Sequence, residues 1–167
     1  MIVLRSWTDQ WELIDGIPYA MSPLPTPKHQ RIANNLGAEF RQALKKCNSS
    51  CTAYQPLDYK IADDTVVQPD VLIVCGEIEK PYLDFPPALV AEILSPSTFL
   101  KDRHTKYGLY QTQGVRYYLI IDIDVEEVEV YELVNHQYAL QQKGKDILFA
   151  LQIDTCQSTV HFANIWD

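Results

Sequence analysis

The sequence lacks the long apolar runs of membrane proteins and secreted precursors. No window approaches the roughly 20 apolar residues of a membrane-spanning helix, and the first ten residues, MIVLRSWTDQ, hold no apolar stretch of signal-peptide length. It also lacks internal repeats and linkers, and the proline-rich MSPLPTP at residues 21–27 is short enough to be a loop. We therefore expect one domain over residues 1–167, located in the cytoplasm and without membrane contact.

Cysteine is scarce, and its spacing does not suit a metal site. The four cysteines are Cys47, Cys51, Cys75 and Cys156, and only the first two are close in sequence. No second pair of cysteines or histidines completes a zinc-binding spacing. In a chain without secretion features, four reduced thiols are the expectation.

Positive charge is also in deficit. Fourteen Lys and Arg face 22 Asp and Glu, which gives a formal net charge of -8. This balance argues against tight nucleic-acid binding without metal, because phosphate neutralisation dominates such affinity. Two features reduce the objection: metal-binding carboxylates are negative until a metal arrives, and one short segment gathers Lys101, Arg103, His104 and Lys106.

What is present is an ordinary globular composition, with 47% hydrophobic and 22% charged residues. Asp15-Gly16 between apolar runs predicts a hairpin. Thr26 as N-cap and Pro27 as first residue begin a helix that continues to residue 46. Further elements are expected in this order: strands at 51–61, 66–75 and 87–95, a helix over 99–113 ended by Gly114, strands at 115–124 and 126–134, and short strands to the end.

This order predicts the α/β class, more narrowly an α+β arrangement. A central mixed β-sheet would be flanked by helices and followed by an antiparallel C-terminal extension. The segment at 87–95 is apolar on both faces, which is typical of a central strand covered on both sides.

Glu92 lies inside that apolar segment. A carboxylate in a central strand is costly to bury unless it is paired or binds a cation. Because side chains alternate along a strand, Glu92 shares a face with Val90 and Leu94, and something on that face must compensate its charge.

Asp70 is the natural partner of Glu92, since it begins another strongly apolar strand. Two carboxylates on adjacent strands repel each other unless a proton or a metal lies between them. Oxygen-rich sites of this kind suit magnesium or manganese. A strand-end Asp together with a Glu salt-bridged to a lysine is the competing interpretation, and spacing alone leaves both open.

The helix after Glu92 supplies a lysine. Asp102, Lys106 and Tyr110 are four residues apart, so they lie on one helical face. One interpretation is a surface Asp–Lys pair with a packed tyrosine. In the functional interpretation, Lys106 points back at the carboxylates, where it can orient an attacking water and offset developing charge.

Gln68-Pro69-Asp70 and Ala91-Glu92-Ile93-Leu94 resemble the core of PD-(D/E)xK nucleases, although Leu94 stands where that superfamily usually has its lysine. Over nearly its full length the chain resembles the Uma-two family of restriction-endonuclease-like proteins, common in cyanobacteria. The matching stretches are WELIDGIPYAMS, PTPKHQRIANNL, VVQPDVLIV, LVAEILSPST, DRHTKYGLYQTQGV and RYYLIIDID.

The resemblance implies a restriction-endonuclease-like fold and a metal-dependent endonuclease that hydrolyses phosphodiester bonds of DNA. In the family the lysine has moved to the following helix, which assigns it to Lys106 beside the catalytic Asp70 and Glu92. Magnesium or manganese would be held by Asp70, Glu92 and the Ile93 carbonyl. The family's other recurring polar residues map to Glu12 and His29 as supporting residues, and a homodimer is expected because double-strand cutting usually needs two sites.

Three alternatives remain at this stage. The chain could be a catalytically inactive nucleic-acid-binding module, or a protein-interaction module that pairs through the edge of the strand at 126–134. It could also be a different magnesium-dependent phosphohydrolase on the same carboxylates. Fold analogy alone does not separate these.

Overall fold

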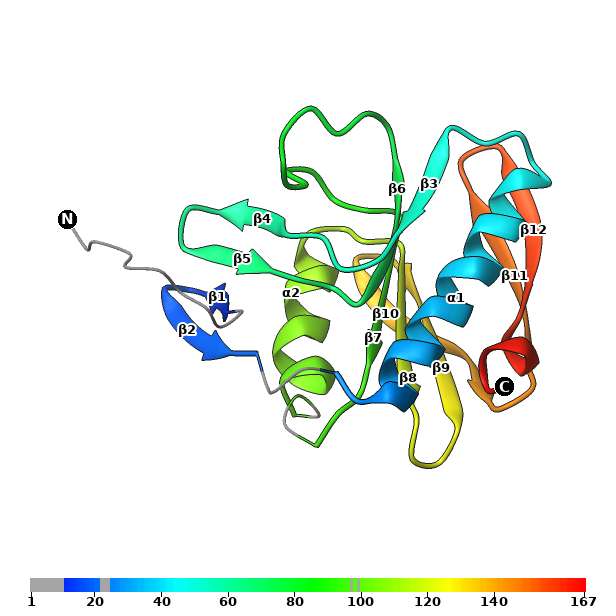
Figure 1. The fold of residues 1–167 in the computed structure, drawn as a ribbon. Coiled ribbons are helices and arrows are strands. Elements are labelled where there is room, and N and C mark those ends of the chain that lie inside the picture. The colour runs from blue at the N-terminus through cyan, green and yellow to red at the C-terminus, as the bar shows by residue number, and fades with distance from the viewer. Residues whose placement is uncertain (1–10, 22–24, 97, 99) are drawn as a thin grey trace.

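A computed structural model of the chain describes residues 11–21, 25–96, 98 and 100–167. Its centre is a six-stranded sheet in the order β10-β9-β8-β7-β6-β3 (Figure 1). β7 and β8 run parallel, whereas the other neighbours in this sheet run antiparallel, so the sheet is mixed as expected. The strands are β3 Cys51–Tyr54, β6 Val71–Cys75, β7 Leu89–Ile93, β8 Tyr117–Asp122, β9 Glu127–Val134 and β10 Gln137–Gly144.

One face of this sheet is covered by α1, Pro27–Lys45. The Thr26 hydroxyl accepts a hydrogen bond from the His29 N–H, and Pro27 begins the helix, which confirms the predicted start. The buried side of α1 joins the sheet in one apolar cluster. The hairpin β11 Leu148–Ile153 and β12 Cys156–His161, with the short helix η2 Phe162–Ile165, completes this layer beside α1.

The opposite face carries the connection between β7 and β8. This connection is a π-helical turn η1, Lys101–Lys106, that continues into α2, Tyr107–Thr112, and ends at Gly114 with φ 76°. A second, smaller sheet in the order β2-β1-β5-β4 lies on the same side. Its strands are β1 Trp11–Ile14, β2 Ile17–Ala20, β4 Tyr59–Ala62 and β5 Thr65–Val67. Asp15 and Gly16 take positive φ between β1 and β2, which confirms the hairpin.

Two predicted strands are wrong in extent. The segment at 51–61 divides into β3 and β4, and the segment at 66–75 divides into β5 and β6. Each pair is split between the two sheets, and a proline stands in each break, Pro56 and Pro69. Proline cannot donate to a sheet ladder, so each segment leaves one sheet at the proline and enters the other.

Two later expectations also need correction. The helix expected over 99–113 is interrupted by the π-helical turn, and its expected first residue, Phe99, lies outside the described residues. The strand at 126–134 is not a sheet edge, because β10 covers it on one side and β8 on the other. Pairing with another chain through that strand is therefore excluded in this fold.

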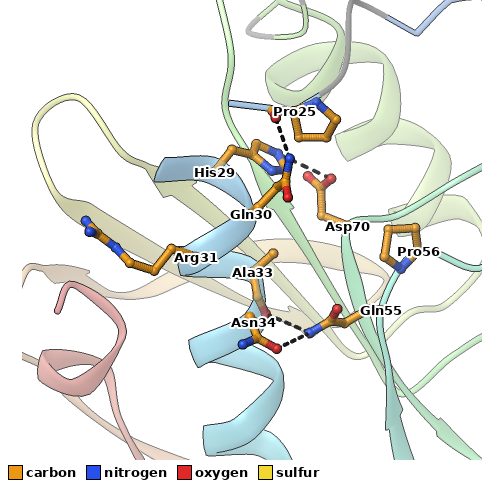
Figure 2. Close-up of a pocket in the computed structure, with 9 residues that line it drawn as sticks. All are labelled: Pro25, His29, Gln30, Arg31, Ala33, Asn34, Gln55, Pro56 and Asp70. Carbon is orange, nitrogen blue, oxygen red and sulfur yellow. Dashed lines mark hydrogen bonds and ion pairs between the residues drawn. The ribbon is translucent and has the colours of Figure 1, made fainter. Parts of the chain in front are cut away.

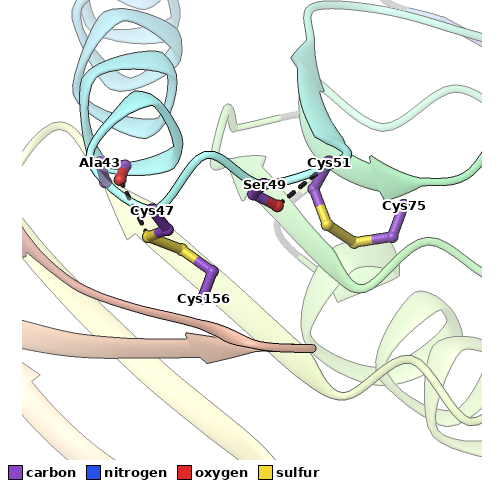
Figure 3. Close-up of a disulfide and its surroundings, with 6 residues drawn as sticks. All are labelled: Ala43, Cys47, Ser49, Cys51, Cys75 and Cys156. Carbon is purple, nitrogen blue, oxygen red and sulfur yellow. Dashed lines mark hydrogen bonds between the residues drawn. A yellow bond between two sulfur atoms is a disulfide. The ribbon is translucent and has the colours of Figure 1, made fainter.

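The four cysteines form two disulfides, which contradicts the expectation of four reduced thiols (Figure 3). Cys51 and Cys75 are directly opposite in the β3–β6 pair, with Cα atoms 4.0 Å apart. Cys47 follows α1 and bonds Cys156 at the start of β12, 109 residues away. Sequence spacing could not reveal these pairs, since each depends on strands or layers meeting in the fold.

Candidate active site

Asp70 immediately precedes β6, and Glu92 lies in β7, the neighbouring strand of the central sheet. Val71 pairs with Ala91 at this end of the antiparallel β6–β7 ladder, and the Asp70 carboxylate accepts the N–H of Ile93, the residue after Glu92. Glu92 shares a face of β7 with Val90, which belongs to the apolar cluster beneath α2. The two carboxylates that the sequence singled out therefore lie at the same end of the β6–β7 pair, Asp70 beside α1 and Glu92 beside the helical connection after β7.

Glu92 is almost fully buried, with 2% of its surface exposed. Its Oε1 accepts hydrogen bonds from Lys106 Nζ at 2.9 Å and from the Tyr110 hydroxyl at 2.8 Å. Both donors come from the helical connection after β7. The compensation demanded by a strand-buried carboxylate is thus supplied by the predicted lysine together with a tyrosine.

Glu12 extends the same network from the small sheet. It is fully buried on β1, and its Oε1 lies 2.7 Å from Lys106 Nζ and accepts the Gln68 N–H at 2.9 Å. Its other oxygen pairs with Lys101 Nζ. Lys106 therefore bridges Glu12 and Glu92, two carboxylates 80 positions apart in the chain.

The electrostatics of this network favour the charged form of Glu12. Burial alone would raise the pKa of the Glu12 carboxyl, but the positive charges and hydrogen bonds of Lys106 and Lys101 outweigh burial and hold the pKa below its ordinary value of 4.5. Tyr110 is affected oppositely: burial first, and then the nearby charge of Glu92, raise the pKa of its phenol well above 10. The tyrosine therefore stays a neutral donor.

The π-helical turn explains how two lysines reach one carboxylate. Lys101 and Lys106 are five residues apart, and a π-helix joins residue i to residue i+5. They therefore stand one turn apart, on the side that faces Glu12. The predicted α-helical face of Asp102, Lys106 and Tyr110 is confirmed for the last two through Glu92, whereas the Asp102 side chain lies outside the described residues.

Asp70 stands in a more open position. Its Oδ2 accepts the Ile93 N–H at 2.8 Å, and its Oδ1 lies 3.4 Å from His29 Nε2. The Asp70 and His29 side chains are 19% and 12% exposed. The expected supporting residue His29 is thus beside Asp70, placed there by the first turn of α1.

A pocket opens next to Asp70 and encloses about 500 Å³ (Figure 2). One end is formed by Asp70 and His29, and the other by side chains of α1 and of the segment that follows β3. The lining residues are Pro25, His29, Gln30, Arg31, Ala33, Asn34, Gln55, Pro56 and Asp70.

The basic segment that offset the acidic composition is used inside the protein. Lys101 and Lys106 pair with site carboxylates, and Arg103 donates two hydrogen bonds to the buried Glu129, with N–O distances of 3.0 and 3.2 Å. The clustering of these cations in the sequence suggested an open phosphate-binding surface. In the structure, Lys101, Arg103 and Lys106 instead pair with carboxylates of the protein itself.

The oxygen groups suit a hard divalent cation. Within the described parts of the chain, no group of three or more His, Cys, Asp or Glu side chains could hold a metal ion. Magnesium, however, keeps several waters and is usually bound through one or two carboxylates plus substrate phosphate. Asp70 is a partly exposed carboxylate of this kind, whereas Glu92 is buried against Lys106 and Tyr110. Within the described residues, Glu12 and Glu92 pair with the ammonium groups of Lys101 and Lys106, and Asp70 lies beside the His29 imidazole.

Sequence reasoning missed three features of this site: Lys101, the donor role of Tyr110 and the backbone of Gln68. Lys101 was noted only as part of a basic segment, because α-helical spacing separates it from Lys106. Gln68, whose backbone binds Glu12, was also missed, since backbone contacts leave no residue-type signal. The five-residue spacing of the two lysines was the available clue.

The mixed sheet flanked by helices, with a helix-borne lysine paired to a strand carboxylate, is restriction-endonuclease-like in class. The chain belongs to the Uma2 family, described as "Putative restriction endonuclease", whose sequence profile matches residues 5–153. It is also similar in fold to a crystal structure from Anabaena variabilis, described as a putative nuclease belonging to DUF820. That similarity has a TM-score of 0.76 at 19% identity and covers 98% of this chain and 93% of the other.

Curated proteins provide no match to the chain. Among the described residues, no helix is both long and apolar enough to span a membrane.

Proposed function

We propose that the chain is a metal-dependent endonuclease that hydrolyses phosphodiester bonds of DNA, with Asp70, Glu92 and Lys106 as catalytic residues. The observation that carries the proposal is the pairing of Glu92 with Lys106 at the end of β7, where the next residue, Ile93, donates its N–H to Asp70. Membership of the Uma2 family supports the nuclease class.

Asp70, Glu92 and the Ile93 carbonyl would hold magnesium or manganese. In an extended strand the N–H and C=O of one residue point to the same edge, and the Ile93 N–H points at Asp70. The Ile93 carbonyl thus points to the same edge of β7 as the N–H that binds Asp70. When bound, the ion would supply a water of lowered pKa and offset charge on the phosphate.

Lys106 would orient the attacking water and stabilise negative charge that develops on the phosphate. Its ammonium group is fixed between Glu12 and Glu92, so it needs little reorganisation during the reaction. Glu12 acts through Lys106 and is a positioning residue. His29 lies against Asp70 and would orient that carboxylate.

Cleavage by Glu92→Gln tests the catalytic assignment. With magnesium and plasmid or single-stranded DNA, the wild type should cut and the variant should lose the activity, since it lacks one metal-binding carboxylate. Glu132→Gln is a matched control: this glutamate also lies in a strand of the central sheet and pairs with Arg116, outside the site. Metal-dependent cleavage that survives in Glu92→Gln would overturn the assignment. Hydrolysis of small phosphoesters without DNA cleavage would favour a different phosphohydrolase.

We also propose that residues 1–167 form one domain and that two copies form a homodimer, so that two sites can act on two strands. A single cooperative unfolding transition and a solution mass twice that of one chain are the expected results.

We propose a cytoplasmic location, where a nuclease meets its substrate. The two disulfides of this chain count against that location, because disulfides are rare in reducing compartments. Cell fractionation is therefore the test, and recovery of the protein outside the cytoplasm would contradict the proposal.

A further inference from the structure

The pocket beside Asp70 has a neutral, amide-rich lining at the end away from the carboxylate (Figure 2). Asn34 comes from α1, and Gln55 comes from the segment that follows β3. The Gln55 Nε2 donates to Asn34 Oδ1 at 3.3 Å and to the Ala33 carbonyl at 3.5 Å. The two amides are therefore held side by side.

This pairing leaves a donor and an acceptor for a ligand. An amide side chain carries two N–H donors and one carbonyl acceptor. The contacts between the two residues use the Gln55 amino group and the Asn34 carbonyl. In the described parts of the chain, the Gln55 Oε1 and the Asn34 Nδ2 have no hydrogen bond. Such an acceptor–donor pair matches the edge of a nucleobase, as amide side chains do with adenine.

The charges in the pocket favour a base over a phosphate. Asp70 lines it with a carboxylate that repels an anion, while the cation in the lining, Arg31, extends away from the other labelled side chains (Figure 2). Pro25 and Pro56 add apolar ring surface. A volume of about 500 Å³ falls in the range of small-molecule sites and accommodates a nucleotide.

Gly37 shows that the position of Gln55 depends on a close approach to the helix. A Cβ added at Gly37 would lie 3.1 Å from Gln55 Nε2 and 3.3 Å from Arg41 Nη1. Gly37 is buried in the middle of α1, where glycine weakens a helix relative to alanine. The absence of a side chain there lets the Gln55 amide lie against the helix.

We propose that this pocket is a base-recognition subsite, in which Asn34 and Gln55 read the edge of a nucleobase next to the scissile phosphate. The proposal rests on the proposed nuclease function, because Asp70 is shared between the pocket and the catalytic group. It adds a substrate preference that the catalytic residues alone do not provide.

Cleavage of a randomised DNA pool, with the cut ends sequenced, tests the proposal. The wild type should favour one base at a fixed position beside the cut by at least about fivefold, as expected for a bidentate amide–base pair. Asn34→Asp replaces the donor with an acceptor, and Gln55→Ala removes the acceptor, so both should lose or change the preference while still cutting. Gly37→Ala keeps both amides but crowds Gln55, and should weaken the preference. Gln42→Ala changes an exposed amide on the same helix and should leave it unaltered.

The outcomes separate this proposal from the nuclease proposal. Cutting without a base preference, or a preference unchanged in Asn34→Asp and Gln55→Ala, overturns the subsite and leaves the nuclease standing. If the wild type cuts no DNA, NMR titration with the four deoxynucleosides replaces the assay. Saturable binding that Gln55→Ala weakens at least about tenfold supports the subsite. Absence of saturable binding, or equal binding by the variant, overturns it.

Discussion

Glu92 and Asp70, two carboxylates of the candidate active site, have different surroundings. Glu92 belongs to a buried half, formed with Glu12, Lys101, Lys106 and Tyr110, in which the glutamates are at most 2% exposed. Asp70 belongs to an open half, formed with His29 and facing the pocket, where exposure reaches 19%. The buried half is fixed by the protein before any ligand arrives, whereas the open half is where a substrate would approach. The first should therefore govern stability, and the second should govern binding.

The largest loss of stability is expected from Lys106→Met. The change removes the ammonium between Glu12 and Glu92 and leaves two buried carboxylates facing each other. Breaking a buried pair by removing one partner costs about 3–5 kcal/mol. Urea denaturation measures this effect, and Lys46→Met, an exposed lysine just after α1, should change the unfolding free energy by less than about 0.5 kcal/mol. Equal losses of unfolding free energy in the two variants would contradict the claim that the buried half governs stability.

The two disulfides should also stabilise the fold, and none of their cysteines belongs to either half of the site. Cys47→Ser opens a loop spanning 109 residues, and Cys51→Ser opens one spanning 24. A typical loss is about 2–4 kcal/mol, and the longer loop should cost about 1 kcal/mol more. Thermal unfolding of each variant under non-reducing conditions measures the difference. A larger loss in Cys51→Ser would contradict the loop-length explanation.

Glu12→Gln should lower the free energy of unfolding by less than these changes do, and the size of the loss should depend on pH. Hydrogen bonds to charged groups contribute about 1.5–3 kcal/mol, which sets the loss near neutral pH. The pKa of Glu12 is held below 4.5, so its charged form stabilises the fold above that pH, and the contribution is lost as the pH falls through the lowered pKa. The gap between the wild type and the variant should therefore narrow below pH 4.5. Glu77→Gln, at an exposed position, should show no such gap at any pH.

The smallest effect on stability is expected from Asp70→Asn. Asparagine has the same shape and can still accept the Ile93 N–H, and the position is partly open to solvent. The unfolding free energy should change by less than about 0.5 kcal/mol. A loss as large as that of Lys106→Met would mean that the open half is structural after all.

The sequence allowed the buried half to be anticipated only in part. A glutamate inside an apolar strand signalled a charge that needed a partner, and the helix that follows directly supplies one, since Lys106 pairs with Glu92. Lys101 was not predicted, because it meets Glu12 across 89 residues of sequence and through a π-helical turn. Contacts between distant segments leave no periodic pattern.

The fold class and the central strand were predicted because hydrophobic pattern dominates both. The extents of the strands at 51–61 and 66–75 were not, since each continues across a proline into a different sheet. The disulfides were missed for a related reason: Cys51 meets Cys75 only when β3 pairs with β6. Local signals predict elements well, whereas pairing partners are decided by the whole fold.

Calorimetric titration of magnesium and manganese into the wild type and Asp70→Asn, with DNA cleavage measured on the same preparations, tests the central claim most directly. The proposed site predicts that the wild type binds metal and nicks plasmid, and that Asp70→Asn does neither while remaining folded. If the wild type binds no metal at millimolar concentration even with DNA present, Asp70 and Glu92 are structural and the chain is not a metal-dependent nuclease.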